Sequence, residues 1–109
     1  MSKKSFQSFE EFWPFYVGEH RNPQNRRFHF LGTSLVVLSL AGAALTANLG
    51  LVVLAPFLGY SCAWFGHFFV EKNRPATFQY PFYSFIADFK MFWLILTGKM
   101  DQEIARLKL

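Results

Sequence analysis

The chain has 109 residues, enough for one domain, and 52% of them are hydrophobic, including 15 phenylalanines. The net charge is +4, but the basic residues cluster at the flanks of an apolar run, which argues against nucleic-acid binding. A single cysteine, Cys62, excludes an internal disulfide and a cysteine-based metal site.

Residues 30–66, 37 in all, contain no Asp, Glu, Lys, Arg or His. A membrane helix needs about 20 apolar residues, so this run is long enough for two short crossings and too long for one. It predicts a transmembrane hairpin of helices at about 23–47 and 51–72, with a tight turn at 48–50. Basic residues lie at the open end and none at the turn, which places the open end at the cytoplasmic face.

Two further helices are expected around the hairpin. Residues 5–20 place aromatic side chains on one helical face, with Ser5 or Ser8 as the N-cap and Pro14 as a kink or break. This pattern indicates an amphipathic helix that lies in the membrane interface or packs on the rest of the protein. A fourth, partly embedded helix is expected at about 82–97. The predicted fold class is all-α, an integral membrane helical bundle, and its small buried surface makes a homodimer a further expectation.

All three histidines lie at the same end of the predicted hairpin. His29 comes just before the apolar run, His67 just after it, and His20 at the end of the first helix. Glu71 follows His67 by one helical turn, which places both on one face of an α-helix. Imidazoles with one carboxylate and no thiolate suit Fe(II), Zn(II) or Mn(II). The pattern therefore predicts a metal site, and three histidines are too few for a membrane di-iron enzyme.

Further polar residues are predicted near this site. Arg74 can bind a carboxylate through two hydrogen bonds. Asp88 lies in an otherwise apolar helix and needs a partner there, for which Arg74, Lys90 or a metal-ligating histidine are candidates. Asn25 and Asn73 are candidates for hydrogen bonds that orient the metal ligands.

The residues leave three kinds of function open. An iron site with vacant positions is typical of non-haem oxygenases. A zinc site would instead indicate a hydrolase of a membrane lipid. A protein without metal would be a non-catalytic lipid-binding or scaffold protein, and metal content distinguishes all three.

Two segments resemble motifs of the Mpo1-like family, formerly a domain of unknown function. They are residues 20–29, HRNPQNRRFH, and residues 66–76, GHFFVEKNRPA. The later residues that match are Tyr80, Pro81, Ser84 and Asp88. The resemblance covers about residues 12–98 and implies one small multi-helix membrane domain over residues 1–109. It also implies an Fe(II)-dependent dioxygenase that uses O₂ to shorten a 2-hydroxy fatty acid by one carbon, in fatty-acid α-oxidation.

The resemblance further implies that His20, His29 and His67 are the iron ligands. Where the fungal branch of the family has a second, adjacent histidine, this chain has Arg21. Glu71 is therefore expected to complete the site as a ligand or to accept a proton. Arg74 is expected to neutralise the substrate carboxylate. A bacterial inner membrane, with the site at its cytoplasmic face, is the expected location.

Overall fold

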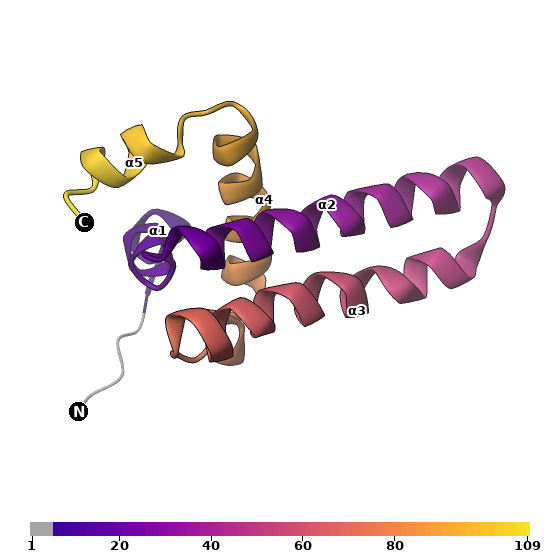
Figure 1. Cartoon of the computed structure of the whole chain (residues 1–109), viewed down its shortest axis with the longest axis horizontal. Helices are drawn as coiled ribbons and strands as arrows, with labels where there is room; N and C mark the ends of the chain where they lie inside the picture. The colour runs from indigo at the N-terminus through magenta and orange to yellow at the C-terminus, as the bar shows by residue number, and fades with distance from the viewer. Residues whose placement is uncertain (1–5) are drawn as a thin grey trace.

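The longest elements of the structure are α2 (Pro23–Thr46) and α3 (Leu49–Phe65), which lie side by side as a hairpin (Figure 1). This computed structural model describes residues 6–109, and within that range every regular element is helical. The shorter α-helices are α1 (Phe9–Gly18), α4 (Pro81–Leu96) and α5 (Met100–Arg106). The predicted all-α class is confirmed for the described residues.

Local capping explains where the hairpin turns. Asn22 caps α2, because its side-chain oxygen accepts a hydrogen bond from the Gln24 amide at 2.8 Å. Asn48 caps α3 in the same way through the Gly50 amide at 2.9 Å. Helix α3 therefore begins at Leu49, not at the predicted residue 51. The turn is confined to two residues, since Ala47 adopts the left-handed conformation with φ 54° and ends α2.

Small residues let the two long helices approach closely. A Cβ on Gly32 would lie 2.8 Å from the Gly59 carbonyl oxygen, too close for any side chain. Nearer the turn, Ser39 Oγ donates a hydrogen bond across the hairpin to the Leu51 carbonyl at 2.6 Å. These contacts hold the helices together with few large buried side chains.

The end of α3 differs from the predicted α-helix. After Phe65 the chain continues as a π-helical turn, Gly66–Glu71, and Lys72 then adopts a left-handed conformation with φ 61°. In a π-helix the hydrogen bonds span five residues rather than four.

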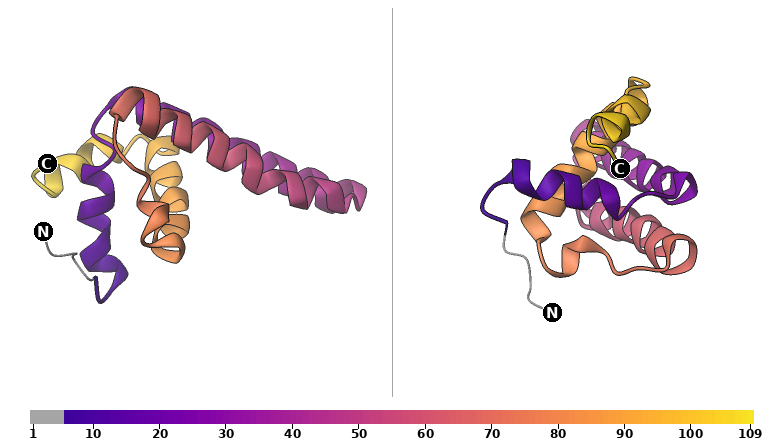
Figure 2. Two further views of the ribbon diagram at one scale, coloured as in Figure 1. Left: turned by 90° about the horizontal axis from the view of Figure 1, so that it is seen from below. Right: turned by 90° about the vertical axis from the view of Figure 1, so that its left-hand side faces the viewer.

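Helices α1, α4 and α5 gather at the open end of the hairpin, and α4 runs across it rather than along it (Figure 2). A short 3₁₀ turn, Ala76–Phe78, leads into α4. The core at this end is made by the inner face of α1 against α4 and α5; it comprises Phe12, Trp13, Tyr16, Val17, Ala76, Ala87, Met91 and Met100. The aromatic face of α1 is thus packed on the rest of the protein, which was one of the two expectations for it.

The boundaries of α1 and α4 follow from local chemistry. Ser8 caps α1 by accepting a hydrogen bond from the Glu11 amide at 3.2 Å, so the helix begins at Phe9. The predicted start at residue 5, with Ser5 as an alternative cap, lies outside the described residues. Helix α1 continues through Pro14 and ends at Gly18, two residues before the predicted end. Helix α4 begins with Pro81 at its first position and ends at Leu96, close to the predicted 82–97.

Candidate metal centre

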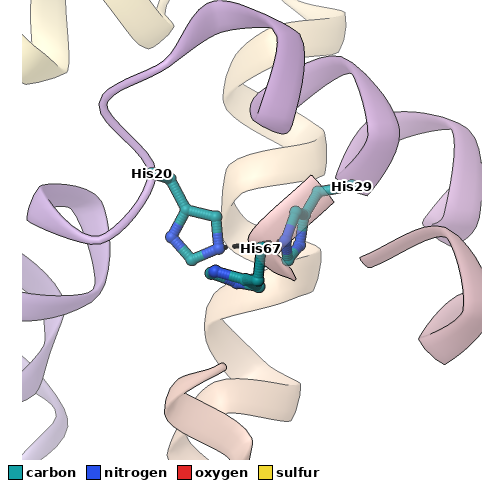
Figure 3. A group of neighbouring side chains, drawn as sticks. All are labelled: His20, His29 and His67. Atoms are coloured by element: carbon teal, nitrogen blue, oxygen red, sulfur yellow. Dashed lines mark hydrogen bonds between the residues drawn. The ribbon is translucent and has the colours of Figure 1, made fainter. Parts of the chain in front are cut away.

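Three buried histidines from three segments of the chain meet at the open end of the hairpin (Figure 3). His20 follows α1, His29 lies in the second turn of α2, and His67 lies in the π-helical turn. One ligand nitrogen from each ring lies within 4.8 Å of those from the other two. The side chains are almost fully covered, with exposed fractions of 0%, 5% and 1%.

The partners of the Nδ1 atoms fix the proton positions on two of these rings. His20 Nδ1 lies 2.6 Å from the Tyr16 carbonyl oxygen, which only accepts, so this nitrogen carries the proton. His67 Nδ1 lies 2.7 Å from Asn73 Oδ1. The Asn73 amide nitrogen donates to the Glu19 carbonyl at 3.0 Å, which keeps its oxygen facing His67. The Nε2 lone pairs of His20 and His67 are therefore left for a ligand.

The third ring completes the group. His29 Nε2 lies 3.1 Å from His20 Nε2, and His29 Nδ1 lies 3.6 Å from Asp88 Oδ1. Two nitrogens bound to one metal ion by bonds of about 2.1 Å are separated by about 3.0–3.4 Å, so the observed spacing fits a shared ion. Without an ion, the His29 proton lies on Nε2, which donates a hydrogen bond to His20 Nε2. With one, the His29 proton belongs on Nδ1, facing Asp88.

The surroundings of His20 keep its imidazole in the ligand form. Burial lowers the pKa of His20 well below its usual value, and the neighbouring His29 and His67 lower it further. A metal ion needs the neutral imidazole, so this environment favours coordination over protonation.

Asp88 has one partner of an expected kind, a histidine, and one that the sequence did not predict, Tyr16. Its Oδ1 accepts a hydrogen bond from the Tyr16 hydroxyl and lies beside His29. Burial raises the pKa of the Asp88 carboxyl to about 6, against the opposing effects of that hydrogen bond and of His67. Of the partners expected for Asp88, the one that lies beside it is a histidine, His29. Lys90 instead lies over the Trp13 ring, with Nζ 4.4 Å from the ring centroid.

Tyr16 is a residue of this candidate site that sequence reasoning missed. Its carbonyl holds His20, its ring stacks on the His20 ring at 4.1 Å, and its hydroxyl holds Asp88. The available signal was its position four residues before His20 on the aromatic face of α1, which indicates contact between the two rings.

Glu71 lies apart from the three histidines. Its Oε1 accepts hydrogen bonds from the Asn22 amide at 3.0 Å and from Asn25 Nδ2 at 3.1 Å. These hydrogen bonds direct the Glu71 carboxylate towards the start of α2. Asn25 is fully buried between Glu71 and Gly66, where a Cβ would lie 2.1 Å from its Oδ1. Both residues thus join α2 to the π-helical turn.

Arg74 lies in the loop after Asn73, and its side chain is exposed. It lines a surface hollow with Phe68, Phe69, Lys72 and Asn73. Among the described residues, Asp88 is paired with Tyr16 and His29 rather than with Arg74.

An apolar cleft of about 280 Å³ begins beside the histidines. It starts at His29 and Asp88 and follows the hairpin to Leu40 and Val52. The other lining residues are Thr33, Val36, Ala55, Pro56, Gly59, Tyr60, Ala63, Phe85 and Phe89. A long apolar cleft with polar groups at one end is the usual form of a site for an apolar ligand with a polar head.

The fold and site define a helical protein with two helices long and apolar enough to cross a membrane. A buried three-histidine centre lies at the open end of the hairpin that these helices form. The chain belongs to the Mpo1-like family: the family model described as 2-hydroxy-palmitic acid dioxygenase Mpo1-like matches residues 6–100. No curated protein and no solved structure matches the chain. The match of the family model confirms the resemblance indicated by the two histidine-containing motifs.

Proposed function

We propose that this protein is a membrane-embedded, Fe(II)-dependent dioxygenase that shortens 2-hydroxy fatty acids by one carbon. The observation that carries the proposal is the group of three buried histidines, each with Nδ1 facing an oxygen and each with one ring nitrogen within 4.8 Å of those of the other two. The family description names the substrate class, since it refers to 2-hydroxy-palmitic acid.

The exposure of the hairpin supports a place in the membrane. Only 28% of the most apolar stretch of α2 is buried within the protein, and only 17% of that of Leu49–Glu71, the segment formed by α3 and the π-helical turn. A core helix of a water-soluble protein would be mostly covered, whereas a membrane helix presents its apolar side chains to lipid. A cytoplasmic orientation of the open end is supported by its basic residues, which are Arg21, Arg26, Arg27, Lys72 and Arg74.

The three-histidine ligand set is compatible with iron, and the family description, which names a dioxygenase, favours iron over zinc. Three neutral imidazoles would occupy only some of the coordination positions of Fe(II). The remaining positions would be open to the hydroxy acid and O₂, and the iron would supply the redox chemistry. Glu71 is not needed as a fourth ligand in this scheme. Its hydrogen bonds to Asn22 and Asn25 instead position the start of α2, and with it His29, against the turn that carries His67.

Asp88 is the group placed to accept the proton of the substrate hydroxyl. It lines the apolar cleft, lies 3.6 Å from His29, and has a pKa of about 6, so it is mostly ionised at neutral pH. Tyr16 holds the carboxylate in place by its hydrogen bond. Arg74, exposed beside Asn73, stays our predicted partner for the substrate carboxylate.

The reaction balances with O₂ as the oxidant. The C1–C2 bond breaks, C1 leaves as CO₂, and C2 becomes the carboxyl carbon of the shortened acid. The remaining oxygen atom leaves as water, so one O₂ is consumed for each hydroxy acid.

Metal content after anaerobic purification in detergent tests this proposal first. We expect about one iron per chain in the wild type, none in His67→Ala, and unchanged iron in the matched control Phe68→Ala, which alters an exposed neighbour in the same turn. O₂ uptake with 2-hydroxy fatty acids should follow the iron content. Zinc without O₂ uptake would identify a lipid hydrolase instead. Absence of metal from all three proteins would favour a non-catalytic lipid-binding or scaffold protein.

A further inference from the structure

The apolar cleft follows one face of each long helix over about three turns. On α2 it is lined by His29, Thr33, Val36 and Leu40, which are spaced by four, three and four residues. With a rise of about 1.5 Å per residue, the eleven residues from His29 to Leu40 span about 16 Å. The cleft is thus long and narrow, the shape of an extended unbranched chain.

The chemistry of the lining changes along this length. Polar groups occur only towards the end at His29 and Asp88, where Thr33 and Tyr60 lie nearby. Beyond them the walls are apolar, and the small residues Ala55, Gly59 and Ala63 on α3 leave the space that forms the cleft. At the far end, Leu40 and Val52 are the last lining residues before the turn.

We propose that this cleft holds the acyl chain of the hydroxy acid, and that Leu40 and Val52 limit the chain length accepted. The inference rests on the proposed function for the identity of the polar head. A volume of about 280 Å³, at the lower limit for small-molecule sites, suits one chain rather than the two of a phospholipid. The head end is also covered, because Thr33 and Ala63 are 7% exposed and α4 contributes Phe85, Phe89 and Asp88.

Photo-crosslinking tests the position of the chain in the full-length protein in phospholipid nanodiscs. One 2-hydroxy fatty acid probe carries a diazirine near its head and another carries it at the methyl end. We expect the first to label Thr33, Tyr60 or Ala63, and the second to label Leu40 or Val52. Labelling of outward-facing residues such as Val53 and Phe57 by both probes alike would overturn the proposal. Equal labelling of the cleft by a diazirine phospholipid would do the same.

A pair of variants on α3 tests the length limit. Val52→Phe adds volume at the far end of the cleft, while Val53→Phe adds the same volume to the next residue, which is 64% exposed and is not part of the lining. Val52 is 44% exposed although it lines the cleft, so the fold should tolerate either change. Binding is measured with a series of 2-hydroxy fatty acids of increasing length, in protein with and without Fe(II).

For Val52→Phe we expect weaker binding of the longest acids only, by about tenfold, because the added ring overpacks the far end of the cleft when their last methylenes enter it. Val53→Phe should bind like the wild type. Identical length dependence in the two variants would overturn the length limit, even if O₂ uptake confirmed the dioxygenase. Ordered labelling and a shifted length limit without O₂ uptake would support the acyl site while the dioxygenase proposal failed.

Discussion

Tyr16 and Asp88, 72 residues apart in the sequence, are joined by a hydrogen bond from the tyrosine hydroxyl to the carboxylate. The same tyrosine holds His20 through its backbone carbonyl at 2.6 Å. One residue of α1 therefore orients a predicted metal ligand with its main chain and the predicted proton acceptor with its side chain. These two roles can be separated by mutation.

Tyr16→Phe should keep the metal and change the pH dependence of turnover. The carbonyl that holds His20 is unaffected, whereas loss of the hydroxyl removes a hydrogen bond that lowers the pKa of Asp88. Because that pKa rises above about 6, less carboxylate is ionised at pH 7, and the rate profile moves to higher pH. We expect about a tenfold loss of O₂ uptake at pH 7, equivalent to about 1.4 kcal/mol. Tyr83→Phe, in the same aromatic core, is the control, and an unshifted profile in Tyr16→Phe would remove Asp88 as the proton acceptor.

Asn73 should control metal affinity without being a ligand. Its Oδ1 accepts the His67 Nδ1 proton at 2.7 Å, and partners of this kind typically contribute 10–100-fold to metal affinity. Asn73→Ala should weaken Fe(II) binding by about that factor. Asn73→Asp keeps an acceptor for His67 but loses the donor to Glu19, so it should bind iron more tightly than Asn73→Ala. Equal affinities in a competitive chelator titration would show that Asn73 does not orient His67.

Two glycines should respond oppositely to the same substitution. At Gly66 a Cβ would lie 2.1 Å from Asn25 Oδ1, and at Gly18 it would meet no atom within 4 Å. We expect Gly66→Ala to cost about 1–3 kcal/mol and to reduce metal content, since it pushes Asn25 and α2 away from the π-helical turn. Gly18→Ala should be neutral or stabilising by about 0.4–1 kcal/mol. Thermal unfolding in detergent compares them, and equal midpoints would contradict the close packing at Gly66.

Glu103 should attach α5 to α1 down to unusually low pH. Its carboxylate accepts hydrogen bonds from Arg106 and from Trp13 Nε1 at 2.6 Å, and the Arg106 hydrogen bond is the main cause that lowers the pKa of Glu103 to about 2. A lowered pKa in the folded state stabilises the fold above the ordinary value of about 4.3, and this contribution is lost as pH falls towards 2.

The Trp13 indole N–H resonance reports this titration. It should shift with a midpoint near pH 2 in the wild type and show no such shift in Glu103→Gln. A wild-type midpoint near 4.3 would show that Glu103 is not held by these partners.

The hairpin and the meeting of the histidines were predictable because both depend on simple features of the chain. Residues 30–66 carry no charge, and a hairpin necessarily returns His67 to the level of His29. The position of the Glu71 carboxylate was not predictable, because it depends on hydrogen bonds from Asn22 and Asn25 at the start of α2, which are tertiary contacts. The Tyr16–Asp88 contact depends on how α4 crosses the hairpin, which is a matter of tertiary packing rather than of helical periodicity.

The three histidines also have a consequence for the lifetime of the protein. They come from the connection after α1, from α2 and from the end of α3, so an ion bound to them ties together three segments. An ion that binds only the folded state stabilises it by about 2.7 kcal/mol when its free concentration is 100 times its dissociation constant. With iron as the proposed metal, cells short of it would therefore hold less of this protein, because the chains made without metal open more often and are removed by proteolysis.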